Sequence, residues 1–177
     1  MTHNMLRTAF IFLAAASLFS CKTTQSLSTV NEVDIRKYSG QWYEIARLPN
    51  SFEKGLECVT AIYTLKESDK IEVLNKGYSV KKEGEFKTAK GTARVPDSDF
   101  PGRLKVSFFW PFSGDYYIIS LDENYSYALV GDPSRKYLWV LSRDRTLDDQ
   151  VYSDLIELAR NKGFETDNLI RVNQDCN

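Results

Sequence analysis

The chain has 177 residues, which is enough for one domain with a sizeable hydrophobic core. Its 23 basic and 24 acidic side chains give a formal net charge of -1. This balance gives no electrostatic reason to expect a nucleic-acid partner, and it leaves little general attraction to an anionic membrane. Aromatic residues make up 13% of the chain, which favours strands and an apolar pocket.

The N-terminal segment has the pattern of an export signal. Arg7 precedes an apolar run from Ala9 to Phe19, and the small residue Ser20 follows it. A basic start, a short apolar core and a small final residue are typical of a cleaved signal peptide. The run is too short for a membrane-spanning helix, which needs roughly 20 apolar residues. We therefore assign residues 1–20 to a signal peptide.

Cys21 directly follows this signal. The four residues from Leu18 to Cys21 resemble the lipobox of bacterial lipoproteins, in which the cysteine is acylated and becomes the first mature residue. The resemblance implies a lipid anchor at Cys21, and we expect residues 21–29 to form a flexible tether. Lys22 is not the aspartate that retains lipoproteins in the inner membrane of enteric bacteria, which favours the periplasmic face of the outer membrane. The alternative is ordinary secretion, with Cys21 incidental.

Two further cysteines remain once Cys21 is assigned to the anchor. Cys58 and Cys176 form an even pair in a chain bound for an oxidising compartment, which predicts a disulfide. The alternative is a reactive thiol at Cys58.

The central part of the chain alternates short apolar runs with turn signals. The runs are rich in Val, Ile, Tyr, Phe, Trp and Thr, and short strands at such spacing indicate an all-β antiparallel sandwich or barrel. We predict eight strands, near residues 42–47, 59–65, 70–78, 85–94, 103–109, 115–121, 125–130 and 137–142.

One helix follows the last predicted strand. Apolar residues repeat at helical spacing from Val151 to Ala159, Thr146 can cap the N-terminus, and Gly163 can end the helix. The strand at 137–142 is apolar on both faces, because Leu138 and Val140 face opposite to Trp139 and its neighbours. One face can therefore line a barrel while the other lies under the helix.

The stretch from Tyr38 to Arg47, with Gly40 and Trp42, resembles the first signature of the lipocalins, and Arg143 ends a segment similar to the third. The similarity runs from about Val30 to Cys176. It implies an eight-stranded antiparallel up-and-down barrel over residues 30–177, with one C-terminal α-helix packed on the outer wall.

The resemblance also implies a closed end. In lipocalins the tryptophan of the first signature lies inside this end, and the arginine of the third packs over it. Carried onto this chain, the plug is formed by Gly40, Trp42 and Arg143. An arginine over an indole face contributes about 0.5–2 kcal/mol.

Strand alternation, anchored on Trp42 and Arg143, predicts which side chains face inward. The predicted lining is mostly apolar, and an eight-stranded barrel can enclose one small ligand. It favours an acyl chain, such as that of a fatty acid or lysophospholipid; the alternative is a structural lipoprotein whose aromatics fill the barrel. The predicted pocket residues are Glu44, Ala46, Ala61, Tyr63, Val73, Asn75, Leu104, Val106, Phe108, Trp110, Tyr137, Trp139 and Leu141.

Two features of this lining stay open at this stage. Glu44 can orient a polar ligand head, or it can pair with a neighbouring basic residue near the closed end. The apolar segment from Phe108 to Phe112 can be a rim gate, a contact between two copies of the chain in a homodimer, a membrane contact or a buried corner.

Little in the sequence points to catalysis. The one histidine, His3, lies in the export signal, which removes histidine-based triads and disfavours a zinc site. We therefore expect no catalytic residue, no metal and no cofactor. The remaining enzyme hypothesis uses Cys58 as a nucleophile, as a few lipocalin-fold isomerases use a cysteine in the barrel.

Overall fold

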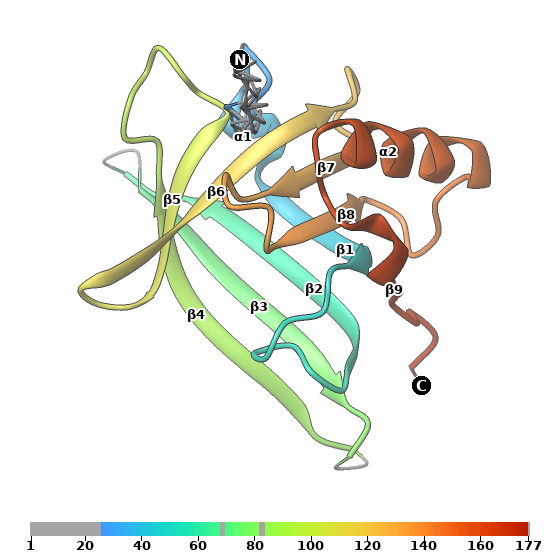
Figure 1. Ribbon diagram of the computed structural model, residues 1–177. Coiled ribbons are helices and arrows are strands. Elements are labelled where there is room, and N and C mark those ends of the chain that lie inside the picture. The colour runs from blue at the N-terminus through green and yellow to red at the C-terminus, as the bar shows by residue number, and fades with distance from the viewer. Residues whose placement is uncertain (1–25, 68–69, 82–83, 177) are drawn as a thin grey trace, which may run out of the picture.

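The computed structural model describes residues 26–67, 70–81 and 84–176, and its main feature is an antiparallel β-barrel (Figure 1). Neighbouring strands in chain order pair with one another, and β1 pairs with both β8 and β2, which closes the barrel. Its strands are β1 (Gly40–Arg47), β2 (Leu56–Leu65), β3 (Ile71–Ser79), β4 (Phe86–Arg94), β5 (Arg103–Phe109), β6 (Phe112–Leu121), β7 (Tyr127–Gly131) and β8 (Leu138–Ser142). The predicted fold is confirmed.

Three short elements were not predicted: helix α1 (Ile35–Tyr38), the 3-10 helix η1 (Thr166–Asn168) and strand β9 (Ile170–Arg171). None is long enough to show a hydrophobic period, so their positions depend on tertiary contacts. Within the described part of the chain, no helix is long and apolar enough to cross a membrane.

The predicted C-terminal helix is α2 (Asp149–Asn161), and its N-cap differs from the prediction. Asp148, not Thr146, caps it, because the Asp148 carboxylate accepts hydrogen bonds from the backbone N–H groups of Gln150 and Val151. The chain leaves the helix at Gly163, whose φ of +87° is in the left-handed region.

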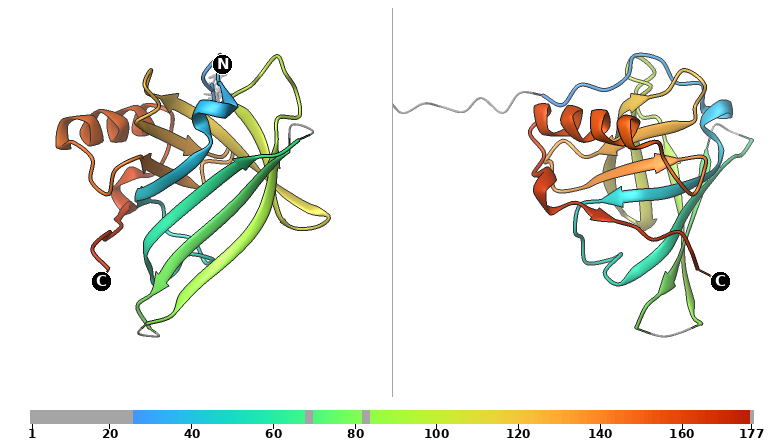
Figure 2. Two further views of the ribbon diagram at one scale, coloured as in Figure 1. Left: turned by 180° about the vertical axis from the view of Figure 1, so that it is seen from behind. Right: turned by 90° about the vertical axis from the view of Figure 1, so that its right-hand side faces the viewer.

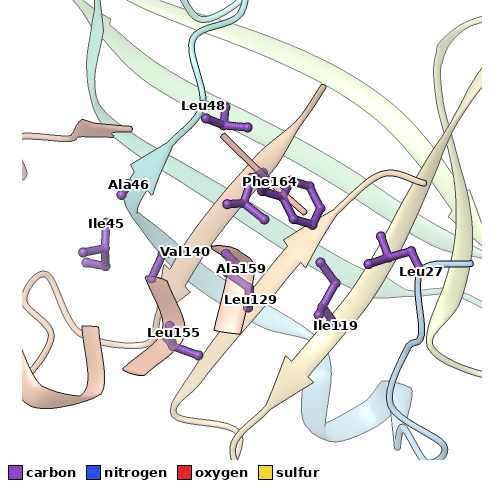
Figure 3. Close-up of a cluster of buried hydrophobic side chains, with 11 residues drawn as sticks. Leu27, Ile45, Ala46, Leu48, Ile119, Leu129, Val140, Leu155, Ala159 and Phe164 are labelled. Atoms are coloured by element: carbon purple, nitrogen blue, oxygen red, sulfur yellow. The ribbon is translucent and has the colours of Figure 1, made fainter. Parts of the chain in front are cut away.

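Helix α2 lies on the outside of the barrel, as both views of Figure 2 show. Leu155 and Ala159 of the helix share a buried apolar cluster with Leu138 and Val140 of β8 (Figure 3). The other face of β8 contributes Leu141 to a second cluster inside the barrel. The two apolar faces of β8 therefore separate two cores, as the sequence predicted.

The described part of the predicted tether belongs to the folded domain. Leu27 is 3% exposed and lies in the cluster under α2, and the Lys162 Nζ donates a hydrogen bond to the Ser28 Oγ. The packed chain thus begins before Val30, because one apolar residue in an otherwise polar segment finds a place against the barrel wall. The predicted signal peptide and Cys21 lie outside the described residues.

The C-terminal segment completes the barrel between β1 and β2. Pairing between these strands runs from Gly40 to Tyr43, and beyond it β9 pairs with Ala46 and Arg47. The Gln174 Nε2 then donates hydrogen bonds to backbone oxygens of both β1 and β2. The predicted disulfide between Cys58 and Cys176 is present and fastens this segment to β2.

Removing the disulfide should therefore loosen the seam between β1 and β2. The bridge joins residues 118 positions apart, and closing so long a loop contributes about 4–5 kcal/mol in the chain-entropy model, usually less in practice. We expect the Cys58→Ala/Cys176→Ala double variant to lose about 2–4 kcal/mol of unfolding free energy in urea titration. Dithiothreitol should lower the wild-type value equally; an unchanged midpoint in both experiments would contradict the role assigned to this segment.

Candidate ligand-binding barrel

One end of the barrel is closed by an indole under a guanidinium. Trp42 is 0% exposed, and the Arg143 guanidinium carbon lies 3.8 Å from the centroid of its ring. Gly40 allows this approach: its φ is +97°, and a Cβ there would lie 3.3 Å from the Arg143 Nη1. The Trp42 Nε1 donates a hydrogen bond to the Tyr38 carbonyl oxygen, so α1 and the plug form one unit.

Arg143 also satisfies the backbone at this end. Its Nη1, Nη2 and Nε atoms donate hydrogen bonds of 2.7–3.2 Å to five carbonyl oxygens, those of Lys37, Tyr38, Ser39, Gln41 and Tyr125. Three of these carbonyls are at the end of α1 or just after it, where a helix leaves acceptors unpaired. The arginine therefore holds α1 across the end of the barrel.

Three phenols lie on the inner side of this closed end. Tyr38 is 2% exposed and Tyr63 is 5% exposed, and both side chains meet Tyr116. The Tyr116 Oη lies 2.7 Å from the Tyr38 Oη and 2.8 Å from the Tyr63 Oη. Burial raises the pKa of all three hydroxyls well above the ordinary value of 10.0, so they stay protonated at neutral pH.

Most of the predicted pocket residues lie in one cluster with Trp42. This cluster lies inside the barrel and is distinct from the cluster under α2. Its predicted members are Ala61, Tyr63, Val73, Leu104, Val106, Phe108, Trp139 and Leu141.

Three other predicted pocket residues lie outside this cluster. Asn75 faces inward, because it pairs in register with Ala61 of the inner cluster. Tyr137 is 38% exposed and stacks on Trp139 with 5.9 Å between ring centroids. Trp110 lies in the turn between β5 and β6 and is 92% exposed. Trp110 is thus a surface residue, since the chain reverses direction there and leaves the wall.

The prediction for Ala46 is corrected by a β-bulge in β1. Glu44 pairs with Leu141, but Ala46 pairs with Val140, so one residue of β1 is unmatched. Both Ile45 and Ala46 therefore pack under α2. The next residue, Arg47, turns inward and is 3% exposed.

The sequence left open whether Glu44 pairs with a neighbouring basic residue, and the structure shows that it pairs with Arg47. The Arg47 Nη1 donates a 2.7 Å hydrogen bond to the Glu44 Oε1, and its Nη2 donates to the carbonyl oxygens of Glu53 and Leu56. The Glu53 carboxylate in turn accepts a hydrogen bond from the Trp139 Nε1 at 3.1 Å. Glu44 thus pairs with a basic residue of its own strand. Both residues lie farther along β1 from Gly40 than Trp42 does.

The Glu44 carboxylate is paired with Arg47 and also lies near the Glu53 carboxylate. Burial, followed by the neighbouring Glu53 carboxylate, raises the pKa of Glu44 well above its ordinary 4.5, although Arg47 acts in the opposite direction. The desolvation of a carboxylate that is 4% exposed outweighs one ion pair.

The end of the barrel opposite α1 is not sealed. In β4, every residue from Phe86 to Lys90 is exposed, on both faces of the strand. This half of β4 has no partner on the β5 side, because pairing there covers only Thr92 to Arg94. In Figure 1, β2, β3 and β4 extend past the other strands at this end. Solvent therefore reaches the inner face of the sheet.

Two hollows mark the outside of the closed end. One has a volume of about 400 Å³ and is lined by Lys37, Arg143 and residues of the β6–β7 turn. The other has a volume of about 320 Å³ and lies between α1 and the ends of β2 and β3. Both lie beside α1 and away from the open end.

The hypothesis of a nucleophilic cysteine is wrong for this structure. The Cys58 sulfur is bonded to Cys176 and is not a thiol. Among residues 26–67, 70–81 and 84–176, no three His, Cys, Asp or Glu side chains are grouped to hold a metal ion.

Sequence reasoning missed four polar residues of the interior. Arg47 and Glu53 were missed because a bulge and a loop bring them there. Tyr38 comes from the unpredicted α1. Tyr116 pairs in register with Leu104 and therefore faces inward. The sequence did not predict this, because β6 has large side chains on both faces and its alternation does not show which face is the inner one.

Arg143→Ala should destabilise the barrel. It leaves five carbonyl oxygens without their donor and uncovers the Trp42 ring, for which we expect a loss of about 2–4 kcal/mol in urea unfolding. Arg36→Ala, an exposed arginine of α1, is the matched control and should change stability by less than about 0.5 kcal/mol. Equal midpoints for the two variants would contradict the plug.

The Glu44 pKa predicts a pH dependence of stability. Because its pKa is raised in the folded state, its contribution is fully present below about pH 4.5 and declines as the pH rises through the folded value. Glu44→Gln keeps an acceptor for Arg47 but cannot ionise, so urea titrations across this range should lack that decline. The control Glu123→Gln, at an exposed site, should keep the wild-type slope. A wild-type slope in Glu44→Gln would exclude this carboxyl as its source.

Comparisons with known proteins agree with this geometry. The model of the lipocalin-like domain family matches residues 33–174. The outer membrane lipoprotein Blc of Vibrio cholerae is 44% identical over 171 residues, covering 96% of this chain and 99% of that protein. The Escherichia coli K12 protein of the same name is 40% identical over 166 residues, covering 94% and 92%.

More distant proteins share the fold. Apolipoprotein D of Bos taurus is 32% identical over 149 residues, covering 80% of this chain and 77% of that protein. Insecticyanin from the tobacco hornworm Manduca sexta superposes with a TM-score of 0.68 at 21% identity, covering 83% and 84% of the two chains. The predicted outer-membrane location agrees with the bacterial relatives, and the chain belongs to the lipocalin family as a homologue of the outer membrane lipoproteins named Blc.

Proposed function

We propose that this protein is a lipid-anchored carrier that holds a fatty acid, a lysophospholipid or a similar hydrophobe in its barrel. It would serve lipid storage, lipid transport or membrane maintenance at the periplasmic face of the outer membrane. The anchor is the predicted acylated Cys21, which lies outside the described residues.

The observation that carries this proposal is the contrast between the two ends. The Trp42 end is packed and closed, whereas the inner face of β4 is exposed from Phe86 to Lys90. A barrel that served only as a filled scaffold would bury its inner face along the whole length. An inner surface that is mostly apolar near the closed end and opens to solvent at the other end fits an elongated hydrophobe.

The strength of such binding follows from the chain length of the ligand. Burying about 14 methylenes supplies on the order of 10 kcal/mol before the costs of association. Those costs leave affinities of about micromolar to nanomolar. No covalent chemistry is needed for this function.

The exposed aromatic residues of the β5–β6 turn suit a protein held at a membrane. Phe109, Trp110 and Phe112 are 80%, 92% and 78% exposed. Among the alternatives for this segment, a buried corner is excluded by that exposure. The turn belongs to the open end, so it would lie where ligand enters and leaves.

Native mass spectrometry of the soluble domain, from residue 22 onward, tests the carrier proposal. The domain is incubated with total bacterial lipid extract and separated from free lipid. We expect one lipid bound per barrel, drawn from single-chain amphiphiles. Retention of no lipid class above background would refute the proposal.

Trp139→Ala tests whether the inner wall carries the affinity. Trp139 lies in the inner cluster but is only partly buried, so its loss should weaken binding of a fluorescent fatty-acid analogue about tenfold and leave the domain folded. Trp110→Ala removes the same side chain from the exposed turn and is the matched control. Unfolding of Trp139→Ala, or equal affinities of the two variants, would contradict this role.

A further inference from the structure

The three phenol hydroxyls at the closed end of the barrel, its floor, carry three protons but form only two hydrogen bonds with one another. Tyr63 donates to Tyr116, and a second bond joins Tyr116 to Tyr38, with either oxygen as donor. Three hydroxyl groups carry three protons, and two bonds use two of them. Whichever direction the second bond takes, one O–H group has no acceptor within the trio. A buried donor without an acceptor is costly, so the floor is poised to donate to a bound group.

A complementary acceptor lies one step nearer the open end. The Asn75 Oδ1 is buried and has no hydrogen-bond partner among the described residues. Val73 pairs in register with Tyr63, and Asn75 is two residues farther along β3, so its side chain faces the same side one step above the floor. The floor therefore offers a spare donor and the wall a spare acceptor.

Two small residues lie next to this position, on β2 and β6. Moving from the floor toward the open end, Tyr63 is followed by Ala61 on the inner face of β2, and Tyr116 by Gly114 on that of β6. A Cβ added at Gly114 would meet no atom within 4 Å. Gly114 therefore leaves space on the inner face of β6 next to Tyr116.

The charges of the interior select against an anion here. Burial, and then the carboxylates of Glu53 and Glu44, raise the pKa of Tyr63. The single arginine of that cluster, Arg47, already donates to Glu44 and to two carbonyl oxygens. A ligand carboxylate beside Tyr63 would meet this negative potential with no free cation from the cluster to offset it.

We propose that Tyr38, Tyr63, Tyr116 and Asn75 form a polar subsite deep in the barrel. The subsite takes an uncharged group that both accepts and donates one hydrogen bond, namely a hydroxyl or a protonated carboxyl at the inner end of an aliphatic chain. The group accepts from the spare phenol proton and donates to the Asn75 Oδ1. The inference rests on the proposed carrier function and names the ligand chemistry of that same site.

The test compares ligands with one chain length and different ends. Dodecyl alcohol, dodecyl methyl ether, dodecane and dodecanoate compete at neutral pH against a fluorescent fatty-acid analogue. Only the alcohol both donates and accepts, so it should bind about fivefold more tightly than the ether, as one added hydrogen bond gives. Dodecanoate should bind more weakly than the alcohol; repeating the acid at a pH where it is uncharged distinguishes a carboxyl from a hydroxyl as the natural group.

Two variants locate the effect. Asn75→Leu removes the acceptor, so the alcohol and the ether should bind equally, and the empty protein should melt at a higher temperature because an unpaired buried oxygen is gone. Tyr63→Phe leaves two hydroxyls with one bond between them, so one proton is still spare and the preference for the alcohol should persist.

The outcomes separate this inference from the carrier function. Equal binding of alcohol, ether and alkane by the wild type would overturn the subsite, whose groups are then satisfied by water, while the carrier function would stand. An alcohol preference that survives in Asn75→Leu would also overturn it. Failure of every ligand, and of the probe itself, to bind would overturn both.

Discussion

The contact between the Arg143 guanidinium and the Trp42 ring organises the rest of the barrel. One side chain from the end of the last barrel strand covers an indole from the first strand and donates to five backbone carbonyls. It thereby fixes α1 across one end and leaves Tyr38 facing inward. Because these contacts hold the strands together at the closed end, the opposite end of the barrel can stay open.

The packing of the barrel changes along its strands, from the closed end to the open end. Near α1 the inner residues are packed, whereas the far half of β4 is unpaired toward β5 and exposed on both faces. Between these regions lie polar groups that a purely structural core would avoid: a Glu44–Arg47 ion pair, three phenols and an unpaired amide oxygen. Buried groups of this kind reduce stability unless they are satisfied, and a bound ligand can satisfy them.

The sequence was sufficient for the fold class and, through its resemblance to the lipocalin signatures, for the contact that closes one end. All eight strands lie within three residues of their predicted bounds, since turn residues and alternating apolar runs are local signals. The Cys58–Cys176 bridge followed from the count of cysteines in an exported chain. Trp42 and Arg143 were placed by the resemblance to the lipocalin signatures, and strand alternation counted from them gave the inward faces of β2, β3, β5 and β8.

Tertiary structure decided where that alternation breaks. The bulge at Ile45 moved Ala46 to the outer wall and brought Arg47 to Glu44, and no local pattern in an apolar strand marks a bulge. The helix cap at Asp148 and the packed Leu27 depended likewise on contacts with the barrel. The phenol trio joins residues far apart in the chain, so only closure of the sheet could bring their hydroxyls together. The alternation of residues along a regular strand thus determines which side chains face inward, and long-range packing determines the bulges, caps and side-chain contacts that depart from that alternation.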